Sequence, residues 1–167
     1  TVDNCGTCDT DSPNDCIQDE CGVWGGNDDS CPNLNELIDI EIDDDNRASN
    51  TWCNQDEKAD VSEVIEILVK VKNNGASTAY NVTGSISLPN NDLNCADIQD
   101  SAITLPDISS GSSIWSNEDF DIHIQCAPNG DDLDFTLEFN YENSSGQSFT
   151  SEIDFDVKNN FLGSIEI

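Results

Sequence analysis

The sequence predicts an all-β fold built from antiparallel strands, preceded by a loop segment that disulfides and metal ions hold together. From Leu37 onward, short runs alternate apolar with polar residues, which is the period of a half-buried strand. Glycine, asparagine, aspartate and proline separate these runs, and none of the runs has a helical period. Residues 1–33, in contrast, hold five of the eight cysteines and very few apolar side chains.

In each run we expect the apolar residues to face one core. About seven short strands over roughly 125 residues are typical of an immunoglobulin-like sandwich of two sheets, and this is the architecture that we predict. The runs span residues 37–42, 64–72, 79–89, 114–126, 132–143 and 147–158. The expected inward residues include Ile38, Ile40 and Ile42, then Ile65, Ile67, Val69 and Val71, then Phe120, Ile122, Ile124 and Cys126, then Leu133, Phe135, Leu137, Phe139 and Tyr141, and finally Phe149, Ile153, Phe155 and Val157.

The change of pattern after Pro32 divides the chain into two units, residues 1–33 and residues 34–167. The first unit cannot bury enough apolar surface to offset the entropy that it loses on ordering. Disulfides or metal ions must therefore order it, or it stays disordered. The chain has no methionine, which indicates that Thr1 is a processed or internal position.

The charge excludes several classes of partner. The chain carries 35 acidic residues against 5 basic ones, a formal net charge of -30. Such a surface cannot neutralise phosphates, so we expect no nucleic acid, and no apolar run reaches the roughly 20 residues of a membrane span. A strongly acidic surface attracts cations. Eight cysteines in a chain of this size indicate an oxidising compartment, so we expect an extracellular or cell-surface protein.

Acidic and amide side chains are phased with the cysteines and glycines of residues 1–33. Calcium takes six to eight oxygen ligands, and carboxylates brought together without a cation repel one another by several kcal/mol. We therefore expect Ca²⁺ as the cofactor of this segment. Asp43–Asp45 offers a further cation site or a solvated loop. The candidate ligands in the first unit are Asp3, Asp9, Asp11, Asn14, Asp15, Asp19, Asn27, Asp28 and Asp29.

Three alternatives compete with calcium in this segment. The acids of a disordered leader would simply be solvated. Zinc is less favoured, because the cysteine spacing is not that of a zinc ribbon and thiols of a secreted chain oxidise first. A redox role for the C-x-x-C motif at residues 5–8 lacks the strand and helix that such motifs need.

An imperfect repeat guides the cysteine pairing. Residues 3–16, "DNCGTCDTDSPNDC", align with residues 19–31, "DECGVWGGNDDSC". The alignment favours two bridges in the leader, and two more cysteines within the predicted sandwich are expected to pair across it. Spacing alone does not fix connectivity. The expected bridges are Cys5–Cys16, Cys21–Cys31 and Cys95–Cys126, with Cys8 and Cys53 left to join the leader to the loop at 43–60.

Both units resemble known surface-protein families. The repeat is similar to the "DECGVCGGD"-like cysteine repeats of large bacterial surface proteins and, more loosely, to thrombospondin type 3 calcium repeats. From Val61 on, "ILVKVKNNGASTAYNVTGSISLP" and "ITLPDISSGSSIWSNEDFDIHI" resemble bacterial immunoglobulin-like modules of the CARDB and NEW3 kind. This resemblance implies a spacer, binding or assembly domain of secreted proteins.

Two functions fit these features, and neither is enzymatic. With His123 as the only histidine, no catalytic triad or Cys–His pair is compelling. The first function is a subunit of an extracellular filament that assembles with copies of itself. Its C-terminal run "NFLGSIEI" alternates apolar residues beyond the last predicted strand, so it needs either its own sheet or a neighbour's. The alternative is a module of a large bacterial adhesin, with a glycan or protein as its ligand.

Overall fold

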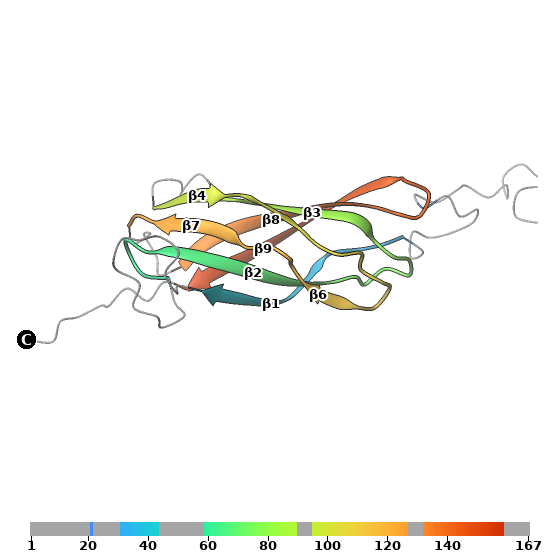
Figure 1. The fold of residues 1–167 in the computed structure, drawn as a ribbon, viewed down its shortest axis with the longest axis horizontal. Helices are drawn as coiled ribbons and strands as arrows, with labels where there is room; N and C mark the ends of the chain where they lie inside the picture. Colours follow the sequence, from blue (N-terminus) through green and yellow to red (C-terminus); the bar gives the residue numbers. More distant parts are fainter. Residues whose placement is uncertain (1–20, 22–30, 44–58, 90–94, 127–131, 159–167) are drawn as a thin grey trace, which may run out of the picture.

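The computed structural model describes residue 21 and residues 31–43, 59–89, 95–126 and 132–158 (Figure 1). Within these ranges every regular element is a β-strand and every strand pair is antiparallel, so the predicted all-β fold is confirmed there. No helix that could cross a membrane occurs in this part of the chain. The strands are β1 (Glu36–Asp43), β2 (Val64–Lys72), β3 (Tyr80–Ser87), β4 (Ala96–Asp100), β5 (Ala102–Thr104), β6 (Ser113–Trp115), β7 (Phe120–Ile124), β8 (Asp132–Glu142) and β9 (Ser148–Lys158).

The strands form two sheets. One has the order β1-β2-β7-β4, with β6 also paired to β2, and the other has the order β5-β3-β8-β9. A single residue, Ser101, separates β4 from β5, so the chain passes from the first sheet to the second at that point. The edges formed by β4 and β5 therefore lie on one side of the molecule, and β1 and β9 form the edges of the other side (Figure 1).

The buried side chains of both sheets form one hydrophobic core cluster. The predicted inward residues of β2, β7 and β8 are all buried, because alternate residues of each strand face this core. Phe135 of β8 and Phe155 of β9 stack at the β9 side, with ring centroids 5.5 Å apart. The two-residue period of the sequence therefore identified most of the core correctly.

The predicted phase of β1 is wrong at Ile38. A register shift between Leu37 and Asp39 inserts an extra residue opposite β2, which is a β-bulge. Leu37 and Ile40 consequently pack against the core, whereas Ile38 is 41% exposed. A strict period of two does not reveal a bulge, because the extra residue leaves no visible break in the alternation of apolar and polar residues.

The strand prediction also missed divisions in the chain. The run at 114–126 is two strands, β6 and β7, which pair with different parts of β2. Between them Ser116 is buried, and its hydroxyl accepts a hydrogen bond from the amide of Val69 (3.3 Å), while its own amide donates to the Val69 carbonyl (2.9 Å). The short strands β4 and β5 were not predicted.

The Cys95–Cys126 bridge forms as predicted, but it does not cross between the sheets. Cys95 precedes β4 and Cys126 follows β7, and these strands are neighbours in one sheet. The amides of Gln125 and Cys126 both donate to the Cys95 carbonyl, at 2.7 and 3.2 Å. The bridge therefore closes one end of a strand pair.

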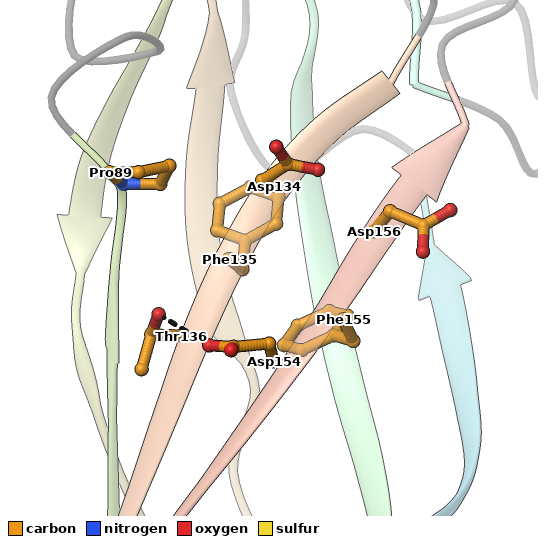
Figure 2. A pocket seen from close by; sticks show the side chains of 7 residues that line it. All are labelled: Pro89, Asp134, Phe135, Thr136, Asp154, Phe155 and Asp156. Atoms are coloured by element: carbon orange, nitrogen blue, oxygen red, sulfur yellow. Dashed lines mark hydrogen bonds between the residues drawn. The ribbon is translucent and has the colours of Figure 1, made fainter.

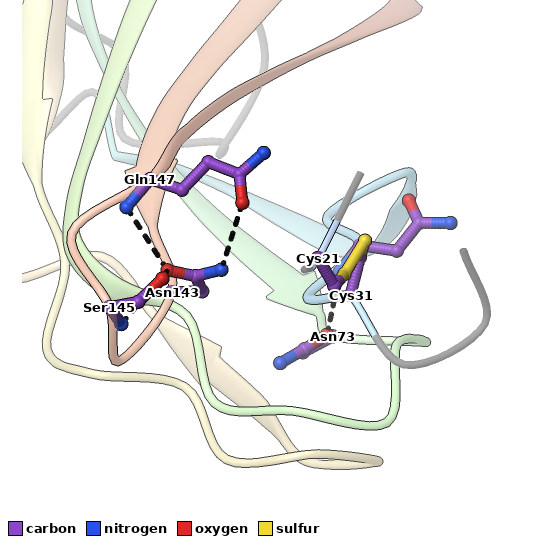
Figure 3. Close-up of a disulfide and its surroundings, with 7 residues drawn as sticks. Cys21, Cys31, Asn73, Asn143, Ser145 and Gln147 are labelled. Atoms are coloured by element: carbon purple, nitrogen blue, oxygen red, sulfur yellow. Dashed lines mark hydrogen bonds between the residues drawn. A yellow bond between two sulfur atoms is a disulfide. The ribbon is translucent and has the colours of Figure 1, made fainter. Parts of the chain in front are cut away.

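The second bridge that the structure describes joins Cys21 to Cys31, as predicted, with 5.3 Å between the Cα atoms (Figure 3). Cys31 is buried at one end of the sheets. The backbone of the next residues is fastened to the β-domain, because the Asn33 amide donates to Oδ1 of Asn73 (3.0 Å) and the Asn74 amide donates to the Asn33 carbonyl (2.8 Å). The predicted bridges Cys5–Cys16 and Cys8–Cys53 lie outside the described residues.

Buried Asn73 organises this end of the fold. Its Oδ1 accepts the amides of Asn33 and Gly75, and its Nδ2 donates to the carbonyls of Ser77 (2.7 Å) and Ile108 (2.9 Å). All the hydrogen-bonding capacity of the fully buried amide is therefore used. The Asn73 side chain thus joins the end of the leader to the loop after β2 and to the loop before β6.

Candidate metal site

Three acidic side chains meet on the outer face of the first sheet. Glu66 lies on β2, Asp121 lies directly opposite it on β7, and Asp119 immediately precedes β7. One carboxylate oxygen from each residue lies within 4.8 Å of the others, and all three residues are half-buried. These residues could hold a metal ion. Since every donor is a carboxylate oxygen, the set suits a hard cation.

Pairing between the strands explains why these acids meet. On β2 the even-numbered residues face outward while Ile65 and Ile67 face the core, and on β7 Asp121 lies between buried Phe120 and Ile122. The register then brings the outward acids of neighbouring strands opposite one another. The same register places Asp43 of the edge strand β1 opposite Glu66 and Asp100 of the edge strand β4 opposite Asp121. The complete acidic row runs Asp43, Glu66, Asp121 and Asp100 across β1, β2, β7 and β4.

The acidic row concentrates negative charge on one band of the sheet. Like charges directly opposite one another on a sheet are destabilising by a fraction of a kcal/mol or more. Oδ1 of Asp121 is also shielded from solvent, which raises the free energy of its charged form. A cation held by Glu66, Asp119 and Asp121 would reduce the repulsion between the carboxylates and the free energy of the charged form of Asp121. Sequence reasoning missed this cluster, because abundant acids hide which ones share a face and lie on paired strands.

The nine ligands predicted in the leader lie outside the described residues, so the structure places none of them. Of the additional candidates at 43–45, only Asp43 is described, and it forms one end of the acidic row. His123, the only histidine of the sequence, is half-buried on β7 between Val64 of β2 and Asp97 of β4.

A pocket of about 370 Å³ opens on the second sheet (Figure 2). Asp134 of β8 lies opposite Asp156 of β9, and the hydroxyl of Thr136 donates to Oδ1 of Asp154 at 2.8 Å. Carboxylates dominate the polar groups of this pocket, so its chemistry suits a cationic or hydroxyl-rich ligand. The lining residues are Pro89, Asp134, Phe135, Thr136, Asp154, Phe155 and Asp156.

No protein-family model matches this chain, and no curated protein matches it significantly.

Proposed function

We propose that the chain is a structural subunit of an extracellular filament or surface fibre, stabilised by calcium and disulfides and assembled head-to-tail from copies of itself. The observation that carries this proposal is the anchoring of the leader on the β-domain. Cys31 is bridged to Cys21, and the residues that follow it are hydrogen-bonded to Asn73 and Asn74. Firm attachment of the leader at Cys31–Asn33 suits a subunit that carries load along a fibre.

Leu34 strengthens this junction. Its side chain is fully buried in the core, and its amide donates to the hydroxyl of Tyr141 (3.4 Å), which also hydrogen-bonds Ser151 (2.7 Å). Moving the leader relative to the β-domain would expose Leu34 and break these contacts. Burial of a leucine side chain stabilises a fold by about 1.5–3 kcal/mol. The junction is therefore costly to bend, unlike a linker that connects independent modules.

Calcium is the ion that we propose for this subunit. The predicted ligands of the leader combine carboxylates and amides, and Glu66, Asp119 and Asp121 offer a further oxygen-only site on the β-domain. A net charge of -30 makes copies of the chain repel one another. Bound calcium would reduce that repulsion and so couple ion binding to assembly.

We also propose an immunoglobulin-like arrangement of the β-domain, of the CARDB or NEW3 kind. Its support is the two antiparallel sheets around one core, together with the passage between sheets from β4 to β5. Such domains act as spacers and assembly units of secreted proteins. The two disulfides among the described residues favour an oxidising location, which for this function is the cell surface or the extracellular space.

The acidic pocket favours a second candidate, a calcium-stabilised binding module of a large adhesin. Its carboxylates could accept hydrogen bonds from a glycan or from basic groups of a protein. A glycan array with the full chain distinguishes the candidates. Specific binding that Asp154→Asn abolishes would favour the module, provided that the chain stays monomeric in calcium.

Electron microscopy of the purified chain, with and without a calcium chelator, tests the filament directly. We expect ordered fibres in millimolar calcium that loosen or dissociate when the ion is removed. Calorimetry should show calcium binding that Asp9→Ala/Asp11→Ala weakens. A chain that stays monomeric at high concentration in millimolar calcium would overturn the filament proposal.

A further inference from the structure

β9 forms a long and regular sheet edge. Its eleven residues pair with β8 without a register shift, and no other strand in the described ranges pairs with it. The other edges are shorter, since β5 has three residues, β4 has five and β1 has eight. β1 and β4 also carry register shifts. Short length and bulges protect edges from pairing with other chains, and β9 has neither.

The core is incompletely covered along this side. Phe149, Ile153 and Phe155 of β9 face the core, yet they are only half-buried, whereas their cross-strand partners on β8 are buried. The same is true on the opposite sheet, where apolar side chains of β1 pack against the core and stay half-buried. We call this set the β1–β9 seam. It consists of Leu37, Ile40 and Ile42 of β1 and Phe149, Ile153 and Phe155 of β9.

The topology explains the seam. On the other side of the molecule the chain passes from β4 to β5 after one residue and so closes the gap between the sheets. No such connection joins β1 to β9 within the described ranges, and Figures 1 and 2 both show these two strands on the same side. An added strand on the β9 edge would pair its backbone and cover the half-buried side chains.

We propose that the β1–β9 seam binds residues 161–167 of a second copy of the chain as an added strand. The inference rests on the proposed function and names the surface that receives the neighbour. Of the segments outside the described ranges, only this one alternates apolar residues with little charge, as "FLGSIEI" carries a single glutamate. Phe161, Ile165 and Ile167 would share one face of a strand, with Gly163 between them.

Charge explains why the acidic leader does not fit. The outer face beside β9 carries Asp154 and Asp156, and Glu152 lies opposite Glu138 of β8. A strand rich in acids, such as the leader, would add to this repulsion. Residues 161–167 bring one acidic side chain and a continuous apolar face, so they cover the seam at a lower electrostatic cost than the leader would.

The two shortest turns after Lys158, the last residue of β9, do not bring residues 161–167 back onto the seam of their own chain in a suitable register. A two-residue turn at Asn159–Asn160 would place Ile165 opposite Asp154, on the exposed acidic face. A three-residue turn at residues 159–161 would place Ile165 opposite Phe155, but Phe161 would then take the left-handed position of the turn, which favours glycine. A strand from another molecule has neither restriction, so it can align its apolar face with the seam.

Photo-crosslinking of the full chain tests the occupant. We would place p-benzoylphenylalanine at position 155 and irradiate a mixture of ¹⁴N- and ¹⁵N-labelled chains in calcium. We expect cross-links between position 155 of one copy and residues 161–167 of another, visible by mass spectrometry as mixed-label peptides. Same-label cross-links alone would show that each chain covers its own seam, and cross-links to any other segment would also overturn the inference.

A matched pair of variants tests the surface. Ile153→Lys places a lysine on the seam, whereas Glu152→Lys places a lysine on the outer face of the same strand. We expect Ile153→Lys to raise the critical concentration for assembly at least about tenfold, and Glu152→Lys to leave it unchanged or lower it. If Ile153→Lys is folded and assembles like the wild type, the seam is not the interface and the filament proposal stands. If the wild type never assembles, both proposals fail.

Discussion

Gly75 lies where the end of the leader crosses the turn after β2, and the substitution Gly75→Ala tests this junction. A Cβ atom at position 75 would collide with the Cys31 carbonyl oxygen and lie 2.6 Å from the Asn33 nitrogen and 2.8 Å from the Pro32 carbonyl carbon. These three atoms belong to the backbone of residues 31–33, which cannot rotate away as a flexible side chain can. The alanine must therefore displace the segment from Cys31 to Asn33.

The expected loss of stability follows from what this displacement breaks. The Asn33–Asn73 and Asn33–Asn74 hydrogen bonds are each worth about 1 kcal/mol net. Partial exposure of Leu34, which is fully buried, adds about 1 kcal/mol from a full burial value of about 1.5–3 kcal/mol. We therefore expect Gly75→Ala to lower the free energy of unfolding by about 3 kcal/mol and the melting temperature by roughly 6–12 °C.

Chemical denaturation under non-reducing conditions measures the change, and Gly111→Ala is the control. A Cβ at position 111 meets nothing within 4 Å, so that alanine carries only the cost of its positive φ of 70°, about 1–2 kcal/mol. Hydrogen exchange should show that Gly75→Ala exposes the amides of Asn33 and Leu34 while Gly111→Ala does not. Equal destabilisation by both variants, with unchanged protection of Leu34, would refute the reasoning.

Three further predictions test the bridge, the acidic row and one surface carboxylate. Cys95→Ser should lower the free energy of unfolding by about 2–5 kcal/mol. If the variant and the wild type unfold at the same denaturant concentration, the Cys95–Cys126 bridge does not stabilise the fold. Glu66→Gln should reduce the rise in melting temperature that calcium produces, whereas Glu152→Gln on the outer face of β9 should not; identical rises would count against the metal site. The pKa of Glu36 is lowered by the Asn74 side-chain hydrogen bond and then by Lys72, so its contribution to stability is present above pH 4.5 and lost as pH falls through the lowered value. Glu36→Gln should therefore flatten the acid limb of the stability curve slightly, and NMR titration of the Glu36 carboxyl should show a midpoint below 4.5.

The sequence by itself determined the class of fold and most of the core. Alternation is a local property, because a strand turns successive side chains to opposite faces whatever its neighbours are. Residues such as Phe135 and Ile65 could therefore be assigned to the core without a structure, and both are buried. The pairs Cys21–Cys31 and Cys95–Cys126 were also predicted correctly, from the repeat and from the position of the last two cysteines.

The tertiary structure alone decided how the strands meet. The bulge at Leu37 turned Ile38 outward, the break at Ser116 divided one predicted strand, and the neighbouring positions of β4 and β7 placed the Cys95–Cys126 bridge within one sheet. Each of these depends on register between segments that are distant in sequence. A period of two does not encode register, since any even shift keeps the same residues inside.

The acidic row shows the same limit for function. Asp43, Glu66, Asp121 and Asp100 are separated by as many as 78 positions, and nothing in their local sequence distinguishes them from the other acidic residues. Only the pairing of β1, β2, β7 and β4 brings them into one line. Charge and cysteine content could be read from the sequence, because both are sums over the chain. The place where carboxylates of the β-domain converge is a property of strand order, which only the folded chain possesses.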